Sequence, residues 1–258
     1  MILLSVLFLT GLAVGSFLNV VIVRAARGES VRGRSRCETC GKTLGVWELI
    51  PVLSHVLQKS RCRSCGTVIS VQYPLVELGT AVAFLSVAWF LSPFRYLNVE
   101  IFEYLELLAV FVSVSAGIVI LVSDLRWQII PNGAALILAL VGIAASVARQ
   151  TLAPDLVAAV LGALFFASLW FVSRGRWMGL GDAKLVFTTS LLIGFPGSLV
   201  AILFAFWLGG IAGILLLAAG SKTLKSRIPF GPFIIAGTVL AFFLSDSFIA
   251  FTGFGLLL

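Results

Sequence analysis

The chain has 258 residues, of which 60% are hydrophobic and only 11% are charged, and its net charge is +7 at pH 7. A soluble domain carries about 25% charged residues. So few charges cannot cover the surface of a globule in water, which excludes a soluble globular protein. The chain is therefore predicted to be an all-α polytopic membrane protein, with apolar stretches of roughly 20 residues that each cross a hydrocarbon core of about 30 Å.

The first apolar stretch runs from 1 to 23. No charge precedes it, and Arg24 and Arg27 follow it. A secretory signal has the opposite order of charge, so this stretch is predicted to be an uncleaved span with its N-terminus outside. Seven further spans bring the expected number of transmembrane helices to about eight, and the sixth of the eight is short for a full crossing. The seven are predicted at 74–92, 104–123, 132–149, 155–173, 183–195, 197–219 and 232–253.

The basic residues test this arrangement of spans. With the N-terminus outside, only Arg95 and Arg149 of the 18 Lys and Arg residues fall on the outer side, and the other sixteen fall on the cytoplasmic side. This distribution obeys the positive-inside rule, and it explains the net charge by topology and by anionic lipid. Nucleic acid is not expected as a partner, because no basic helix is interleaved with base-stacking aromatic residues.

The segment 24–73 is the one stretch expected to fold outside the bilayer, as a small cytoplasmic zinc-knuckle domain. It contains Cys37-x2-Cys40 and, after 21 residues, Cys62-x2-Cys65, and a glycine follows each pair. Two such knuckles suit a tetrahedral zinc ion. Iron–sulfur ligation, disulfides and free thiols remain open, although disulfides are disfavoured in a reducing cytoplasm. Four thiolates leave no position for water, so this metal is expected to be structural rather than hydrolytic.

Two other ionisable residues have simpler expected roles. His55 is the only histidine, which excludes the HExxH chemistry of metalloproteases, and it is expected to be a packing or surface residue. Asp155 lies at the end of a predicted span and is expected to be interfacial.

Asp124 and Asp182 stand out among the 11 acidic residues. Each lies at the edge of an apolar span, and the predicted topology places both at the cytoplasmic face. A carboxylate in such a place costs free energy to ionise, and two held close together keep one proton between them. This is the protonation state that an aspartyl protease needs. Gly179 and Gly181 would let the backbone come close to a substrate or to the opposite aspartate.

The residues alone also allow a simpler interpretation of these aspartates. Both could be helix caps, or ion-pair partners of Arg126 and Lys184. A Gly-x-Gly-Asp tetrad by itself is a weak signal.

Taken together, the segments resemble the bacterial type IV prepilin peptidases. The combination and order of the matching stretches are far more specific than any one of them. These stretches are Gly15–Ile22, Ile50–Ser54, Cys62–Gly66, Ile69–Ser70, Tyr73–Glu77, Ile130–Asn132, Gly179–Asp182 and Ile228–Phe233.

The resemblance implies an aspartyl peptidase of the bacterial cytoplasmic (inner) membrane that cuts the leader from prepilins and pseudopilins on the cytoplasmic face. Asp124 and Asp182 occupy the positions of the catalytic pair. Members with the two-knuckle loop usually also methylate the new N-terminal amine with S-adenosylmethionine. The expected division is a first transmembrane helix at 1–23, a methyltransferase-associated four-cysteine domain at 24–73 and a peptidase domain at 74–258. The expected partners are the prepilin N-terminal segment and the lipid bilayer.

Some positions depart from the family pattern. Asn132 stands where the family often has an acid, and Arg24–Ala26 stands where it often has Arg-Leu-Pro, which leaves the start of the cysteine loop open. Glu48 and Glu77 match acidic positions of the loop and its exit. They are expected either to pair with loop arginines or to hold the substrate amine.

Two alternative functions remain open at this point. A presenilin-like intramembrane protease also uses Gly-x-Gly-Asp, but it gives the cysteine loop no role. A transporter or membrane scaffold with a zinc-ribbon module would need ionisable residues at mid-membrane.

Overall fold

The computed structural model describes residues 2–91, 101–221, 223, 226 and 228–252. Within these residues the fold is all helical, as predicted. Arg95, Lys222, Lys225 and Arg227, which entered the charge distribution, lie outside the described residues. The eight long helices are α1 (Ile2–Arg27), α3 (Gln72–Leu91), α4 (Ile101–Trp127), α5 (Asn132–Ala148), α6 (Leu152–Ser173), α7 (Leu180–Ile193), α8 (Gly197–Ala218) and α9 (Gly231–Thr252).

Each of the eight predicted spans coincides with one of these helices. Six of them are long and apolar enough to cross a membrane, whereas α5 and α7 have only 17 and 14 residues. At 1.5 Å per residue, α7 is about 21 Å long, which is less than the hydrocarbon thickness of about 30 Å. The structure therefore confirms the polytopic helical fold and the shortness of the sixth span.

Proline and glycine set several of the helix boundaries. Pro131 and Pro196 stand at the N-cap positions of α5 and α8, where the missing N–H of proline costs nothing. Gly194 ends α7 with a φ of 83°, a conformation that a residue with a Cβ rarely adopts.

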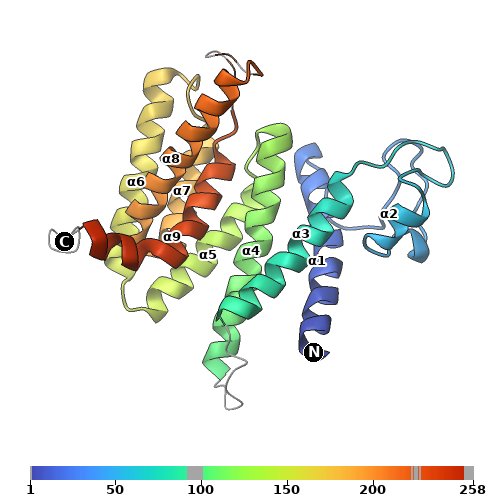
Figure 1. Ribbon diagram of the computed structural model, residues 1–258, viewed down its shortest axis with the longest axis horizontal. Helices are drawn as coiled ribbons and strands as arrows, with labels where there is room; N and C mark the ends of the chain where they lie inside the picture. Colours follow the sequence, from blue (N-terminus) through green and yellow to red (C-terminus); the bar gives the residue numbers. More distant parts are fainter. Residues whose placement is uncertain (1, 92–100, 222, 224–225, 227, 253–258) are drawn as a thin grey trace. The chain divides into compact units, whose positions relative to one another are not determined.

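The chain divides into two compact units, Met1–Val119 and Ile120–Leu258. In the first unit α1 and α3 cross at two glycines (Figure 1). A Cβ added to Gly11 would lie 2.6 Å from the Ala81 Cα, and one added to Gly15 would lie 2.6 Å from the Glu77 Cα. Small residues thus bring the two backbones into direct contact, as is common between membrane helices.

The cysteine loop joins α1 to α3 and contains a 3₁₀ turn (η1, Val46–Glu48) and a short helix (α2, Leu53–Leu57). Its two knuckles repeat one backbone pattern. In each, the amide of the first cysteine donates to the carbonyl five residues on, at 2.9 Å, and the glycine after the second cysteine donates back to the carbonyl of the first. Gly41 and Gly66 have φ values of 72° and 70°, so both knuckles require glycine there.

Arg24 organises the start of this loop. Its guanidinium donates to five successive backbone carbonyls, from Ser30 to Arg34, at 2.7–3.5 Å. The backbone from Ser30 to Arg34 thus curves around the Arg24 guanidinium. These hydrogen bonds fix the turn after α1, although this sequence has Ala25-Ala26 where the resemblance would often place Leu-Pro. Glu38 then ties the loop to both helices, since it contacts Arg27 of α1 and Tyr73 of α3.

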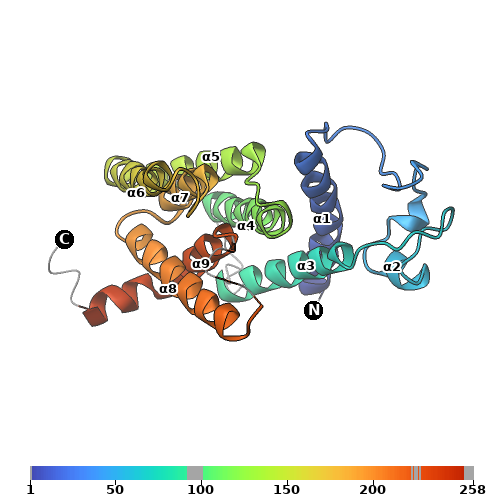
Figure 2. The same cartoon turned by 90° about the horizontal axis from the view of Figure 1, so that it is seen from above.

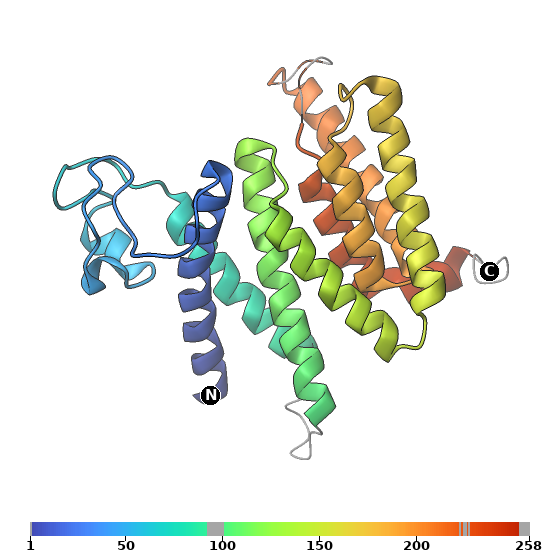
Figure 3. The same ribbon diagram turned by 180° about the vertical axis from the view of Figure 1, so that it is seen from behind.

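In the second unit α7 is the central helix. It packs against α5, α6, α8 and α9, with α5 and α6 on one side and α8 and α9 on the other (Figures 2 and 3). Glycines again allow close approach, because a Cβ on Gly142 of α5 would lie 2.8 Å from the Leu191 Cβ, and one on Gly162 of α6 would lie 3.0 Å from the Val186 side chain. A short helix enclosed in this way has little freedom to move along its axis.

An ion pair between a buried carboxylate and a partly exposed arginine holds the C-terminal end of α7. Asp155, in the first turn of α6, is fully buried within the protein, and its carboxylate lies 3.0 Å from Arg149. The hydroxyl of Thr151 and the amide of Phe195 each donate to Asp155 at 2.8 Å. Arg149 also donates to the carbonyls of Leu191 and Leu192 in the last turn of α7. Asp155 therefore connects the start of α6 with the turn after α7.

We expect Asp155→Asn to lower the thermal unfolding temperature of the protein in detergent. The substitution removes the charge that Arg149 pairs with and weakens the hydrogen bonds of a buried side chain, at a cost of about 1–2 kcal/mol, because Arg149 is partly exposed to solvent. Asp246→Asn makes the same chemical change at an exposed position of α9 and should have little effect. Equal unfolding temperatures for the two variants would show that the ion pair between Asp155 and Arg149 contributes nothing to the stability of the folded protein.

Candidate active site and cysteine cluster

Asp124 is held at the N-terminus of another helix. It is buried near the end of α4, and its Oδ2 accepts a hydrogen bond of 2.9 Å from the amide of Gly231, the first residue of α9. The N-terminus of a helix favours negative charge, so this position stabilises the carboxylate. A Cβ on Gly231 would lie 2.6 Å from the same oxygen, so a larger residue cannot be accommodated without a shift.

Asp182 is held in the first turn of α7. It is also buried, and its Oδ2 accepts a hydrogen bond of 2.9 Å from the amide of Gly179, the N-cap residue. Gly181 faces Ile130, since a Cβ there would meet that side chain at 3.2 Å. Each aspartate therefore has one oxygen bound to a glycine amide at a helix N-terminus.

The structure brings the two aspartates into the same neighbourhood. The link between α4 and α5 lies against the start of α7, because Lys184 donates to the Ile130 carbonyl at 3.1 Å and to Asn132 Oδ1 at 2.6 Å. Burial is the main cause that raises the pKa of Asp182 to about 6, and the charge of Asp124 adds to this rise. Two buried carboxylates in this relation can share one proton and work as a general acid and a general base.

The simpler interpretation of the aspartates is right in part. Asp182 does cap α7. Lys184, however, donates to the link between α4 and α5. Asn132, where the family often has an acid, uses its side-chain oxygen to accept from this lysine.

Gly231 is the residue of this site that sequence reasoning missed. Its segment, Ile228–Phe233, contributed to the family resemblance but received no role. The only indication in the sequence was a glycine between Phe230 and Pro232. Such a glycine does not reveal which carboxylate its backbone amide binds.

The four cysteines come together as predicted. All are free thiols, and their sulfur atoms lie within 4.8 Å of one another. The Sγ atoms of Cys37 and Cys65 are 3.8 Å apart. Zinc–sulfur bonds of about 2.3 Å in a tetrahedron place sulfurs about 3.8 Å apart, so the residues fit such an ion. The side chain and amide of Thr67 lower the pKa of Cys65 to about 6, whereas neighbouring thiols of the cluster raise the pKa of Cys40 to about 11.

Glu48 and Glu77 both bind backbone amides. Glu48 Oε2 accepts from the Gly45 amide at 2.8 Å, and the buried Glu77 accepts from the Val52 amide at 2.7 Å. The loop arginines form their ion pairs with two other glutamates in the described part of the loop. His55 packs within the loop, with its Nε2 2.8 Å from a serine hydroxyl.

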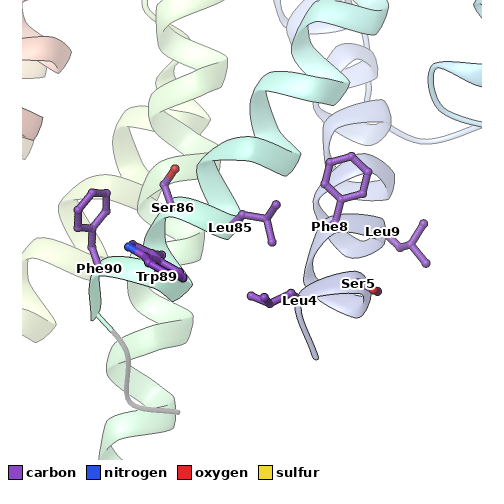
Figure 4. Close-up of a pocket in the computed structure, with 8 residues that line it drawn as sticks. All are labelled: Leu4, Ser5, Phe8, Leu9, Leu85, Ser86, Trp89 and Phe90. Atoms are coloured by element: carbon purple, nitrogen blue, oxygen red, sulfur yellow. The ribbon is translucent and has the colours of Figure 1, made fainter. Parts of the chain in front are cut away.

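A hollow of about 620 Å³ lies between the N-terminal part of α1 and the C-terminal part of α3 (Figure 4). No ionisable side chain lines it, and it belongs to the first unit, whereas both aspartates belong to the second. This hollow is therefore not the site of the carboxylate chemistry. Its lining residues are Leu4, Ser5, Phe8, Leu9, Leu85, Ser86, Trp89 and Phe90.

Comparison with known proteins adds two matching families. Residues 9–91 match the bacterial peptidase A24 N-terminal domain, and residues 111–214 match the type IV leader peptidase family. A prepilin leader peptidase/N-methyltransferase of Bacillus subtilis (strain 168) is 34% identical, over 96% of this chain and 97% of its own length. Proteins of the same name are 37% identical in Myxococcus xanthus, over 84% of this chain and 64% of their own length, and 29% identical in Xanthomonas campestris pv. campestris, over 94% and 93%. No solved structure gives a significant match.

We expect Gly231→Ala to destabilise the second unit by about 1–3 kcal/mol, because the new methyl group overlaps the Asp124 carboxylate. Adding Asp124→Ala to this variant removes the overlap and should recover part of the loss. Thermal unfolding of the single and double variants measures both effects. Gly210→Ala in α8, where a Cβ meets open space, is the matched control. A double variant no more stable than Gly231→Ala alone would contradict this explanation.

Proposed function

The chain belongs to the bacterial type IV leader peptidase family, and we propose that it is an aspartyl endopeptidase that removes the leader of type IV prepilins and pseudopilins. We further propose that it methylates the new N-terminal amine. The similar proteins carry both activities in their names. Membership of an enzyme family argues against the transporter or scaffold that the sequence alone left open.

Asp124 and Asp182 are the proposed catalytic residues. The observation that carries this assignment is that two buried carboxylates from different helices lie near each other, each with one oxygen bound to a glycine amide. Fixed carboxylates that repel each other favour the form with one shared proton. Gly179 and Gly231 support this arrangement directly, and Gly181 allows Ile130 to pack against the start of α7.

In the proposed reaction the ionised carboxylate takes a proton from water, and the water oxygen attacks the carbon of the scissile carbonyl. The protonated carboxyl group gives its proton to the carbonyl oxygen. Collapse of the tetrahedral intermediate then breaks the C–N bond. The carboxyl group that took the proton from water gives it to the leaving nitrogen, and the other carboxylate takes a proton from a hydroxyl group of the intermediate. One water is consumed, and the pair returns to its starting charge.

We propose that the site faces the cytoplasm of a bacterial inner membrane, with the N-terminus outside. Basic residues support this orientation, since Arg24 and Arg27 end α1 and Arg126 lies in the last turn of α4, two residues after Asp124. Water then reaches the scissile bond at the interface without a deep channel. A presenilin-like enzyme would instead cleave within a span.

The cysteine loop is the proposed support of the methyltransferase activity. Cys37, Cys40, Cys62 and Cys65 would hold one structural zinc ion, which fixes the two knuckles relative to each other. S-adenosylmethionine is the proposed methyl donor. For Glu48 and Glu77 we retain the proposal that they hold the substrate amine, with Oε1 as the atom that meets it because Oε2 already binds a backbone amide.

We expect Asp124→Asn and Asp182→Asn each to lower leader removal by about 10³-fold or more, because an amide cannot take or give the proton. A cleavage assay of the purified protein with a prepilin substrate measures this loss. Asp246→Asn serves as the control for the amide substitution. Substantial processing by either variant would refute the role of that residue, provided that its thermal unfolding resembles that of the wild type.

Replacement of a knuckle cysteine is expected to separate the two activities. Cys37→Ser or Cys65→Ser removes a proposed metal ligand, so methylation should fall more than cleavage. Mass spectrometry of the mature pilin N-terminus reports both steps on one molecule. Ser64→Ala changes a residue between two ligands and should leave both activities intact. A cysteine variant whose cleaved product is methylated as fully as that of the wild type would contradict the assignment.

A further inference from the structure

The segment between the two knuckles combines two unusual properties. Between Lys42 and Lys59 there is no Lys or Arg, and the only ionisable residues are Glu48 and His55. Its apolar side chains are nevertheless exposed, with Trp47 at 74% and Val56 at 65% of full exposure. An exposed apolar cluster on a loop marks a surface that is covered by something else. The cluster comprises Val46, Trp47, Leu49, Leu53, Val56 and Leu57.

Contacts with α1 and α3 hold this segment beside the first turns of α3. The Val52 amide donates to Glu77 Oε2 at 2.7 Å, and the backbone of Glu77 lies directly against Gly15 of α1. Gly15 precedes the end of the predicted first span, at 23, by eight residues, or about 12 Å of helix, and Glu77 follows the start of the predicted second span, at 74, by three residues, or about 5 Å. The Val52 amide therefore lies beside the ends of these two spans and not beyond them. Figures 1 and 3 likewise show α2 beside the body of α1 and not beyond its C-terminal end.

Three polar side chains in or beside the segment are paired within the protein. Glu48 accepts from the Gly45 amide, His55 Nε2 pairs with Ser60, and Glu77 accepts from Val52, whereas the buried His55 Nδ1 has no hydrogen-bond partner among the described residues. Polar groups paired within the protein, together with outward apolar side chains, suit the boundary between headgroups and acyl chains.

Basic residues flank the apolar cluster on both sides. Lys42 precedes it, and Lys59, Arg61 and Arg63 follow it. Arg61 and Arg63 are exposed. Lys and Arg next to an apolar surface place their charges at lipid phosphates while the apolar part enters the acyl region.

We propose that residues 46–57 insert into the boundary between headgroups and acyl chains, in the leaflet that holds the C-terminal end of α1. The basic residues of the knuckles then lie on anionic headgroups. The cysteine loop is thus a membrane-surface module and not a domain free in the aqueous phase. This inference does not depend on either proposed enzymatic activity.

Photo-crosslinking of the full-length protein in lipid nanodiscs tests the proposal. Benzoylphenylalanine is placed at position 47, where it preserves an apolar aromatic side chain, or at position 64, which is exposed between two cysteines of the second knuckle. In nanodiscs of phosphatidylcholine with phosphatidylglycerol, we expect several-fold more phospholipid adduct from position 47 than from position 64. Mass spectrometry of the irradiated protein identifies the adducts.

Two outcomes would overturn the proposal. One is an equal yield of lipid adduct from the two positions. The other is an adduct from position 47 with a second copy of the chain or with added prepilin in place of lipid. The basic flank has its own test, because replacing phosphatidylglycerol with phosphatidylcholine should reduce the lipid yield at position 47. An unchanged yield would refute the contribution of the basic residues.

Discussion

The hydrogen bond from a glycine amide to a buried carboxylate is the interaction on which the candidate active site depends. A carboxylate removed from water needs a donor, and the first amides of a helix have no partner within that helix. Gly231 supplies such an amide to Asp124, and Gly179 supplies one to Asp182. Each of these hydrogen bonds therefore has two effects, since it gives a free amide at a helix N-terminus an acceptor and it orients the carboxylate. Because the donor at Asp124 comes from a different helix, the same contact also fixes the place of α9.

The central position of α7 follows from the same requirement. Asp182 is useful only if the short helix that carries it stays in place. Its N-terminal end is tied by Lys184 to the link after α4, and its C-terminal end by Arg149 to the buried Asp155. Four surrounding helices occupy the sides. A helix too short to cross the bilayer is thus held by its neighbours, and its polar first turn lies where apolar spans end.

The first unit uses a different set of contacts to organise its loop. Arg24 donates to backbone carbonyls at the start of the loop, and Glu38 contacts both α1 and α3. Glu77 accepts a hydrogen bond from the amide of Val52 in the middle of the loop. The two knuckles share one backbone pattern, which brings four sulfurs together from pairs that are distant in sequence. These contacts hold the apolar segment between the knuckles beside the first turns of α3.

The sequence by itself determined the helical membrane fold, the eight helices, the pairing of the knuckles and the choice of Asp124 and Asp182 as candidates. These features depend on hydrophobicity, spacing and charge, which are local properties of the chain. Only the tertiary structure decided that the buried Asp155 pairs with Arg149 and that the Gly231 amide binds Asp124. It also decided that Glu77 binds the Val52 amide and not an arginine. Each of these contacts joins different elements or loops, and its energy comes from satisfying a polar group removed from water. Residue type alone does not reveal which group will be its partner.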